Sequence, residues 1–277
     1  MLVIVFGIFL YLIQNVTSFN TERTSSDSPS PPTTAFIIRS HRTYNVALMS
    51  LFYGLQFQKK YYGNVLCIVV PTEYDEIDPI KKYLKKFAKF ESASRFEYKI
   101  LDVPKATYDA HATTLQKICT PEWKSLQLRN GFNPNDLERV CTVNSPLHYQ
   151  ITDIALRKVL RECNDCKYVV VTNADNSYSP KFLAEAIEFI QNYDFIVTDM
   201  IHADAYYKAE VKKGHMDLGG VMFKTDYLAK SNMTFISALP SPAEAHHYHD
   251  ADFLLVDKLV TMGGRVGILN KVLFNHN

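Results

Sequence analysis

Apolar stretches alternate with amphipathic stretches over most of the chain, and this alternation restricts the fold more than any other feature of the sequence. The segments TAFIIRS (34–40), NVLCIVVPTE (64–73) and KYVVVTN (167–173) are nearly continuous in apolar and β-branched residues. Such runs are typical of strands that are buried on both faces of a sheet. We therefore expect an α/β domain whose mostly parallel central sheet carries helices on both faces.

The remaining periodic segments fit this plan. In chain order they predict a helix at 44–63, a helix at 78–90, a strand at 96–104, a helix at 146–163 and a strand at 194–200. Ser179 can cap a further helix that begins at Pro180. Residues 111–141 lack a clear period and predict a long loop. No linker divides the chain after Ala35, so we expect one domain at 35–277.

The amino-terminal region predicts entry into the secretory pathway. Residues 1–19 are uncharged and mainly apolar, which suits a signal peptide or a signal anchor, with a buried strand or helix as the alternative. Residues 20–34 are mostly Ser, Thr and Pro and predict an extended stalk. We expect a type II membrane anchor facing the Golgi or ER lumen, or secretion if the leader is cleaved. Asn232 of the Asn-Met-Thr sequon is the expected glycan site.

Cysteine spacing leaves two disulfides open in such a compartment. Cys119 can pair with Cys141, and Cys163 can pair with Cys166, whereas Cys67 lies inside an apolar strand and is expected to be a buried free thiol. The CNDC segment is a poor zinc signal, because no second Cys or His pair follows at the required spacing.

The charges of the chain are balanced. It carries 30 basic and 29 acidic residues, for a formal net charge of +1. No basic patch is interleaved with aromatic residues, so we expect no nucleic-acid partner.

A polar cluster ends the strand at 167–173 and opens the next helix. Its residues are Asn173, Ala174, Asp175 and Asn176. Ligands of open parallel sheets bind beyond the carboxyl ends of the strands, where Asp175 would face a phosphate-sized space. A lone carboxylate repels phosphate unless a divalent cation lies between them. The alternative is an ordinary turn, because Asn and Asp side chains bond their own backbone.

The run CKYVVVTNADNSYSPKFL (166–183) resembles the motif region of nucleotide-sugar glycosyltransferases with the GT-A fold, most closely the inverting family 2-like group. In those enzymes an Asp-x-Asp motif holds Mn²⁺ or Mg²⁺ on the donor diphosphate. Asn173-Ala174-Asp175 matches this motif with Asn at the first position, which is a departure. The resemblance implies that Asp175 is the metal ligand and that Asn173 and Asp175 contact the donor.

The same resemblance implies further donor contacts. The first strand of such enzymes ends over the base and ribose, a place that Arg39, Ser40 and His41 occupy here. A helix before the motif strand directs polar residues to the base, which Thr152 and Asp153 match.

The carboxyl-terminal half supplies the expected acceptor side. DLGGVMFKTDYL (217–228) resembles the region that precedes the acceptor site, with Asp217 and with Gly219 and Gly220 allowing close approach of a sugar. A hairpin turn is the alternative for the two glycines. The acidic pair that opens a helix in the family aligns with His249-Asp250, which implies Asp250 as catalytic base and Asp252 as the next candidate. Helix capping is the alternative.

A histidine often follows the last strand of GT-A enzymes and returns to the metal. His276 matches this position. The resemblance thus implies a metal-dependent transferase that moves a sugar, with inversion, from a UDP-sugar or related donor to a hydroxyl of a glycan or protein acceptor. A catalytically inactive GT-A-like binding domain is the alternative. A metallohydrolase that uses His246, His247 and His249 is a third hypothesis.

Overall fold

The computed structural model describes residues 32–40, 45–90, 97–109, 119–131, 133–134, 137, 145–241, 247–248 and 250–276. All of them lie in one unit, Pro31–Asn277. His41, His246 and His249 fall outside the described residues, as do the expected leader and most of the expected stalk.

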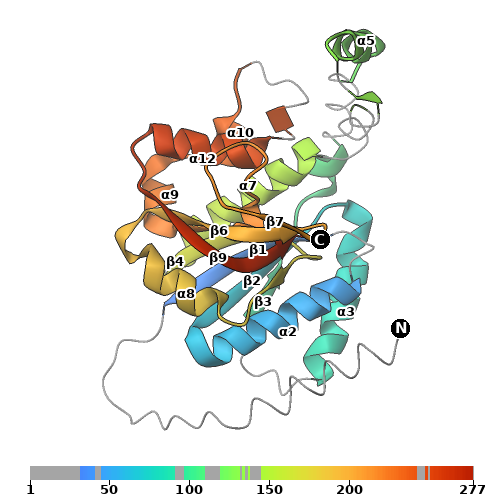
Figure 1. Ribbon diagram of the computed structural model, residues 1–277. Helices are drawn as coiled ribbons and strands as arrows, with labels where there is room; N and C mark the ends of the chain where they lie inside the picture. The colour runs from blue at the N-terminus through green and yellow to red at the C-terminus, as the bar shows by residue number, and fades with distance from the viewer. Residues whose placement is uncertain are drawn as a thin grey trace, which may run out of the picture. The chain divides into compact units, whose positions relative to one another are not determined.

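The described strands form a single mixed sheet (Figure 1). The strands are β1 (Thr33–Ser40), β2 (Asn64–Pro71), β3 (Glu97–Ile100), β4 (Cys166–Asn173), β5 (Ser177–Tyr178), β6 (Phe195–His202), β7 (Ala205–Tyr207), β8 (Val221–Lys224) and β9 (Val266–His276). Their order is β3-β2-β1-β4-β8-β6-β9-β5, and β7 pairs with β6. The β3-β2-β1-β4 half is parallel, as expected, whereas β8 runs antiparallel to both neighbours.

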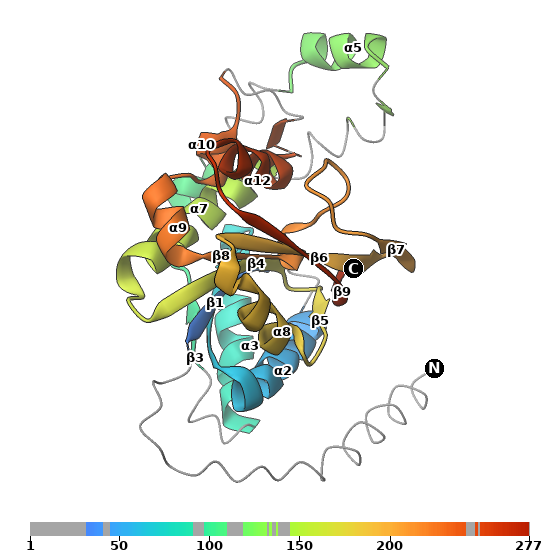
Figure 2. The ribbon, with the colours of Figure 1, turned by 60° about the vertical axis from the view of Figure 1, so that its left-hand side comes forward.

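Helices cover both faces of this sheet (Figure 2). Those that pack into its two cores are α2 (Asn45–Tyr62), α3 (Ile77–Phe90), α7 (Ser145–Glu162), α8 (Phe182–Phe189), α9 (Thr225–Ser231), α10 (Phe235–Ala238) and α12 (Ala251–Thr261). A further helix is α5 (Pro121–Arg129). Among the described residues, no helix combines the length and the apolar content that crossing a membrane requires.

Two hydrophobic cores explain why the strands are nearly continuous in apolar residues. Ala35 and Ile37 of β1 pack into the core that α7, α9, α10 and α12 share. Phe36 and Ile38 pack into the core that α2, α3 and α8 share. Because successive strand residues point to opposite faces, each apolar residue of β1 enters one core or the other. The expected sheet covered on both faces is confirmed.

Two helix starts differ from expectation. A helix, α5, lies within the stretch that lacked a period; the Thr120 side chain caps it by accepting from the Trp123 N–H at 3.2 Å, with Pro121 in the first turn. Thr followed by Pro is a helix start signal, which the expectation of a loop at 111–141 did not include. The helix expected from Pro180 begins at Phe182 instead, although Ser179 Oγ accepts from the Lys181 N–H at 3.3 Å.

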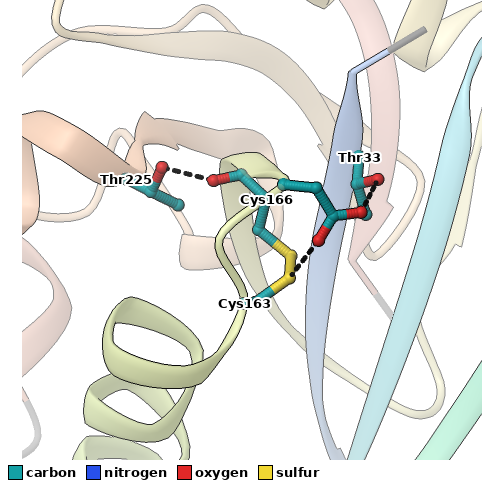
Figure 3. Close-up of a disulfide and its surroundings, with 5 residues drawn as sticks. Thr33, Cys163, Cys166 and Thr225 are labelled. Atoms are coloured by element: carbon teal, nitrogen blue, oxygen red, sulfur yellow. Dashed lines mark hydrogen bonds between the residues drawn. A yellow bond between two sulfur atoms is a disulfide. The ribbon is translucent and has the colours of Figure 1, made fainter. Parts of the chain in front are cut away.

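The turn from α7 into β4 is closed by a disulfide between Cys163 and Cys166 (Figure 3). The Asp165 carboxylate accepts from Thr33 Oγ1 at 2.9 Å, and Thr225 Oγ1 donates to the Cys166 carbonyl at 2.6 Å. The turn is thereby fastened to β1 and α9. Cys119 is also disulfide-bonded, and Cys67 is a buried free thiol, as expected.

Gly219 belongs to a short 3-10 turn, η4 (Leu218–Gly220), that leads into β8. A Cβ added at Gly219 would lie 2.2 Å from a ring carbon of Phe274, and the Gly219 carbonyl accepts from the Tyr178 hydroxyl at 2.9 Å. A Cβ at Gly220 would lie 3.2 Å from Thr198 Oγ1. Both glycines are buried, and the close approach that the structure shows for them is to the neighbouring strands β6 and β9.

Replacing Gly219 with Ala should therefore destabilise the fold. Overpacking against the Phe274 ring costs about 1–3 kcal/mol. Gly54→Ala is the matched control, because nothing lies within 4 Å of a Cβ built there in α2. That change should be neutral or stabilising by about 0.5–1 kcal/mol. Urea unfolding followed by circular dichroism measures both, and equal stability of the two variants would contradict the packing argument.

Candidate functional site

The carboxyl ends of β1 and β4 form the edge at which the predicted site residues meet. Arg39 lies directly opposite Asn173 in the parallel register. Arg39 Nε donates to Asn173 Oδ1 at 2.9 Å, and the Ala174 N–H donates to the Arg39 carbonyl at 2.9 Å. The start of the polar cluster is thereby fixed to the first strand by one side-chain and one backbone hydrogen bond.

The polar cluster is also a turn, and Asn176 makes it. The Asn176 N–H donates to the Asn173 carbonyl at 3.2 Å, and its buried side-chain amide donates to Thr172 Oγ1 at 3.1 Å. Asp175 stays partly exposed at the edge of the sheet. The expected turn is present, and Asp175 lies within it, where its carboxylate accepts a hydrogen bond from its own backbone N–H. The metal-binding role expected of Asp175 stays a prediction.

Burial and three neighbouring side chains act on the Asp175 carboxyl. Burial raises its pKa and the nearby Asp217 carboxylate raises it further, whereas its own backbone N–H, His276 and Arg39 lower it. Asp175 and Asp217 therefore lie in one cluster, in which both carboxylates interact with His276.

His276 reaches this cluster from the end of β9. Its Nδ1 lies 3.4 Å from Asp217 Oδ2, and its ring packs against His202 with centroids 4.4 Å apart. The other Asp217 oxygen accepts from the Gly219 N–H at 2.8 Å, which caps η4. Two residues expected in different roles, Asp217 for the acceptor and His276 for the metal, are thus direct neighbours.

The donor atoms of this cluster suit a hard divalent cation only in part. Carboxylate oxygens and an imidazole are acceptable ligands for Mn²⁺, and Mg²⁺ is usually held by one or two carboxylates together with substrate phosphates. Among the described residues, one group of three potential metal ligands has its ligand atoms within 4.8 Å of one another. This group is Cys163, Asp165 and Cys166. Both of its sulfurs are in the disulfide. Asp175 and His276 alone would be too few ligands, so a cation held by them would need phosphate and water to complete its coordination.

The two aspartates at the start of α12 lie in different surroundings. Asp250 precedes the helix and forms an ion pair with Lys213, with Nζ 2.6 Å from Oδ2. Asp252, in the first turn, accepts a hydrogen bond from the Tyr149 hydroxyl. Burial raises the pKa of Asp252, and the positive charges of Arg39 and His276 lower it. Asp252 therefore belongs to the cluster with Arg39 and His276, whereas the Asp250 side chain is held by Lys213.

Thr152 and Asp153 take structural positions instead of joining the cluster. The buried Thr152 hydroxyl donates to the His148 carbonyl at 2.5 Å. Both Asp153 oxygens accept backbone N–H groups at the start of α10, from Phe235 at 2.9 Å and from Ile236 at 3.0 Å. This capping of the free N–H groups of a helix accounts for a buried carboxylate. The helix does reach the cluster, but through Tyr149, which the sequence analysis missed.

The ends of β1 and β2 add polar groups. Within the described part of the chain, the buried Ser40 hydroxyl has no hydrogen-bond partner. The Thr72 hydroxyl donates to the Ser40 carbonyl at 3.0 Å, and it also lies 3.4 Å from Glu76 Oε2. Thr72 and Glu76 were missed, because Thr72 lies inside the segment expected as a strand at 64–73 and Glu76 follows it.

A separate cavity of about 430 Å³ lies next to the disulfide, lined in part by Cys163, Cys166 and Lys224. It lies at the start of β4, whereas Asn173 ends that strand. It is therefore not part of the cluster around Asp175.

Comparison with known proteins rests on structure alone. No family model matches the sequence, and no curated protein matches it. TarS residues 1–349 from S. aureus superpose with a TM-score of 0.52 at 12% identity, over 89% of this chain and 60% of that one. The same fragment in complex with UDP-GlcNAc gives 0.49 at 12% identity, over 88% and 58%.

A mannosyltransferase, PcManGT from Pyrobaculum calidifontis in complex with GDP-Man and Mn²⁺, superposes with a TM-score of 0.50 at 10% identity. The match covers 97% of this chain and 63% of the mannosyltransferase, so the chain spans only about three fifths of the proteins it resembles. At such low identity the likeness concerns the fold. The mixed sheet flanked by helices on both faces is accordingly the GT-A-like fold of glycosyltransferases.

Proposed function

We propose that this protein is a metal-dependent glycosyltransferase that moves a sugar from a nucleoside-diphosphate sugar to an acceptor hydroxyl. One observation carries the proposal. Side chains from separate segments of the chain, Asp175, Asp217, His276, Arg39 and Asp252, act on one another at the edge where GT-A-like folds bind ligands. The likeness to a mannosyltransferase solved with GDP-Man and Mn²⁺ supports it.

The donor would lie beyond the ends of β1, β2 and β4. Arg39 supplies a positive charge there, and the buried hydroxyl of Ser40 and the Thr72 side chain supply polar groups. A divalent cation held by Asp175 and His276 would offset the charge of the diphosphate and act as a Lewis acid on the leaving group. A UDP-sugar remains the favoured donor. The first test below compares UDP with GDP and so also measures which nucleobase the site prefers.

Asp252 is the better candidate for the catalytic base. Inverting transfer requires a positioned carboxylate that takes the proton of the attacking hydroxyl. The alignment with the family favoured Asp250, but its carboxylate is paired with Lys213. Asp252 has a pKa raised by burial and lies in the electrostatic field of Arg39 and of His276, which is itself a metal candidate. A raised pKa makes the ionised carboxylate a stronger base.

A catalytically inactive GT-A-like binding domain is the second candidate. The neutral Asn173 favours it. The positions of Asp175, Asp217 and His276 favour it too. In the part of the chain that the structure describes, their ligand atoms do not all lie within 4.8 Å of one another. Such a domain would bind a glycan or a protein without transferring a sugar.

The secretory pathway remains the proposed location. The Cys163–Cys166 disulfide supports an oxidising compartment, because disulfides are rare in reducing ones.

Metal-dependent nucleotide binding tests the first part of the proposal. UDP or GDP with Mn²⁺ should raise the Tm of the purified protein, since a ligand at 100 times its Kd adds about 2.7 kcal/mol to stability. The nucleotide without Mn²⁺ should add little. The Asp175→Asn variant should lose the Mn²⁺-dependent rise in Tm. The Asp226→Asn variant, at an exposed position on α9, should keep this rise. Absence of Mn²⁺-dependent protection by any nucleoside diphosphate would refute the proposal.

Substitutions of the two aspartates at the start of α12, Asp250 and Asp252, should differ in their effect on transfer activity. Asp252→Asn should lower kcat by about 10²-fold or more, the usual contribution of a general base, with nucleotide binding kept. Asp250→Asn should retain most transfer. Because the base acts when ionised and its pKa is raised, kcat/KM of the wild type should fall as the pH drops through that raised pKa. The reverse ranking of the two variants in a transfer assay would move the base to Asp250.

A further inference from the structure

A continuous chain of side chains joins the polar motif of β4 to the proposed base. Asn173 accepts from Arg39 Nε at 2.9 Å, and the Arg39 guanidinium carbon lies 5.4 Å from the centroid of the Tyr149 ring. The Tyr149 hydroxyl donates to Asp252 Oδ1. Four elements, β4, β1, α7 and α12, are linked in this way, although their residues are far apart in sequence.

Tyr149 has a fixed ring and a hydroxyl with one specific task. The ring is only 6% exposed and packs on Phe235, with centroids 5.4 Å apart, so the core determines its position. Packing alone would be served equally well by phenylalanine. The hydroxyl adds a hydrogen bond to one oxygen of Asp252, which stabilises the ionised carboxylate and fixes its orientation.

The charge of Arg39 is not offset by its hydrogen-bond partner on β4, because Asn173 is neutral. The guanidinium is anchored by Asn173 and lies over the Tyr149 ring, a favourable place for a cation. From there its charge acts on both Asp175 and Asp252. An aspartate at position 173 would form an ion pair with Arg39 and cancel much of this charge.

We propose that Tyr149 and Arg39 are positioning residues for Asp252, and that the neutral side chain of Asn173 keeps the Arg39 charge available to this carboxylate. Among the residues that the structure describes, the charged and titratable groups that act on Asp252 are Arg39 from β1, Tyr149 from α7 and His276 from β9. The departure from Asp-x-Asp at Asn173 is then a working part of the site. The proposal rests on the proposed function for the proton-accepting role of Asp252, but the positioning is measurable without turnover.

Tyr149→Phe tests the hydroxyl. Carbon-13 NMR of labelled aspartate, with Asp252→Asn to assign the signal, should show a higher pKa for Asp252 in this variant. The acid limb of the pH–rate profile should move to higher pH. On the plateau, where Asp252 is ionised, kcat should still fall about tenfold, because the carboxylate loses the hydrogen bond that fixes its orientation. KM for the donor should stay unchanged, because the ring remains.

Tyr227→Phe is the matched control for this change. Its hydroxyl donates to the Leu259 carbonyl at the far end of the same helix, α12. It should leave the Asp252 titration and the rate as in the wild type. An unchanged Asp252 pKa in Tyr149→Phe, or equal shifts in both variants, would overturn the role of Tyr149.

Asn173→Asp tests the role of the neutral partner. This variant restores the Asp-x-Asp pattern, yet it should lower transfer and raise the Asp252 pKa. Asn164→Asp adds the same charge at an exposed position before the other end of β4 and should do neither. In an Arg39→Met background, Asn173→Asp should shift the Asp252 pKa much less, because the charge it cancels is already gone.

Higher activity of Asn173→Asp, or an equal shift with and without Arg39, would overturn the role of Asn173. If the wild type transferred no sugar from any donor, only the proposed function would be refuted. The NMR titrations of Asp252 would still test whether Tyr149 and Arg39 position this carboxylate.

Discussion

Parallel pairing of β1 with β4 is the constraint on which the rest of the site depends. It places Arg39 opposite Asn173, so that the one cation of the first strand bonds directly to the polar motif of the fourth. The backbone bond from Ala174 to the Arg39 carbonyl continues this pairing one residue beyond the ladder. A shift of register by one residue would turn Arg39 to the opposite face of the sheet and separate it from both Asp175 and Asp252.

Around this pair, three carboxylates share two positive groups. Asp175, Asp217 and Asp252 all interact with His276 or Arg39, and burial raises the pKa of Asp175 and of Asp252. Bringing like charges together at a partly buried edge costs free energy unless a ligand or a cation offsets it. Packing of the core does not offset this cost. The three carboxylates differ in this respect from Asp153, whose oxygens accept hydrogen bonds from backbone N–H groups.

Local sequence predicted the parts of the site that lie where strands end. Arg39, Asn173 and Asp175 follow directly from apolar runs that stop at polar residues, and the structure places them together. Helical positions were harder, because the direction in which a side chain on α7 points depends on what packs there. Asp153 faces the start of α10, whereas Tyr149, one turn earlier, meets Arg39 and Asp252.

By itself the sequence determined the alternation of strands and helices, the covering of both faces of the sheet and the edge at which function is expected. These depend on periodicity and on where apolar runs end, both of which are local properties. Only the tertiary structure decided that Asp252 joins the cluster while Asp250 pairs with Lys213, and that Gly219 makes room for Phe274. Those outcomes depend on contacts between segments far apart in the chain, and the residues that a side chain meets across such distances are set by packing rather than by its neighbours in sequence.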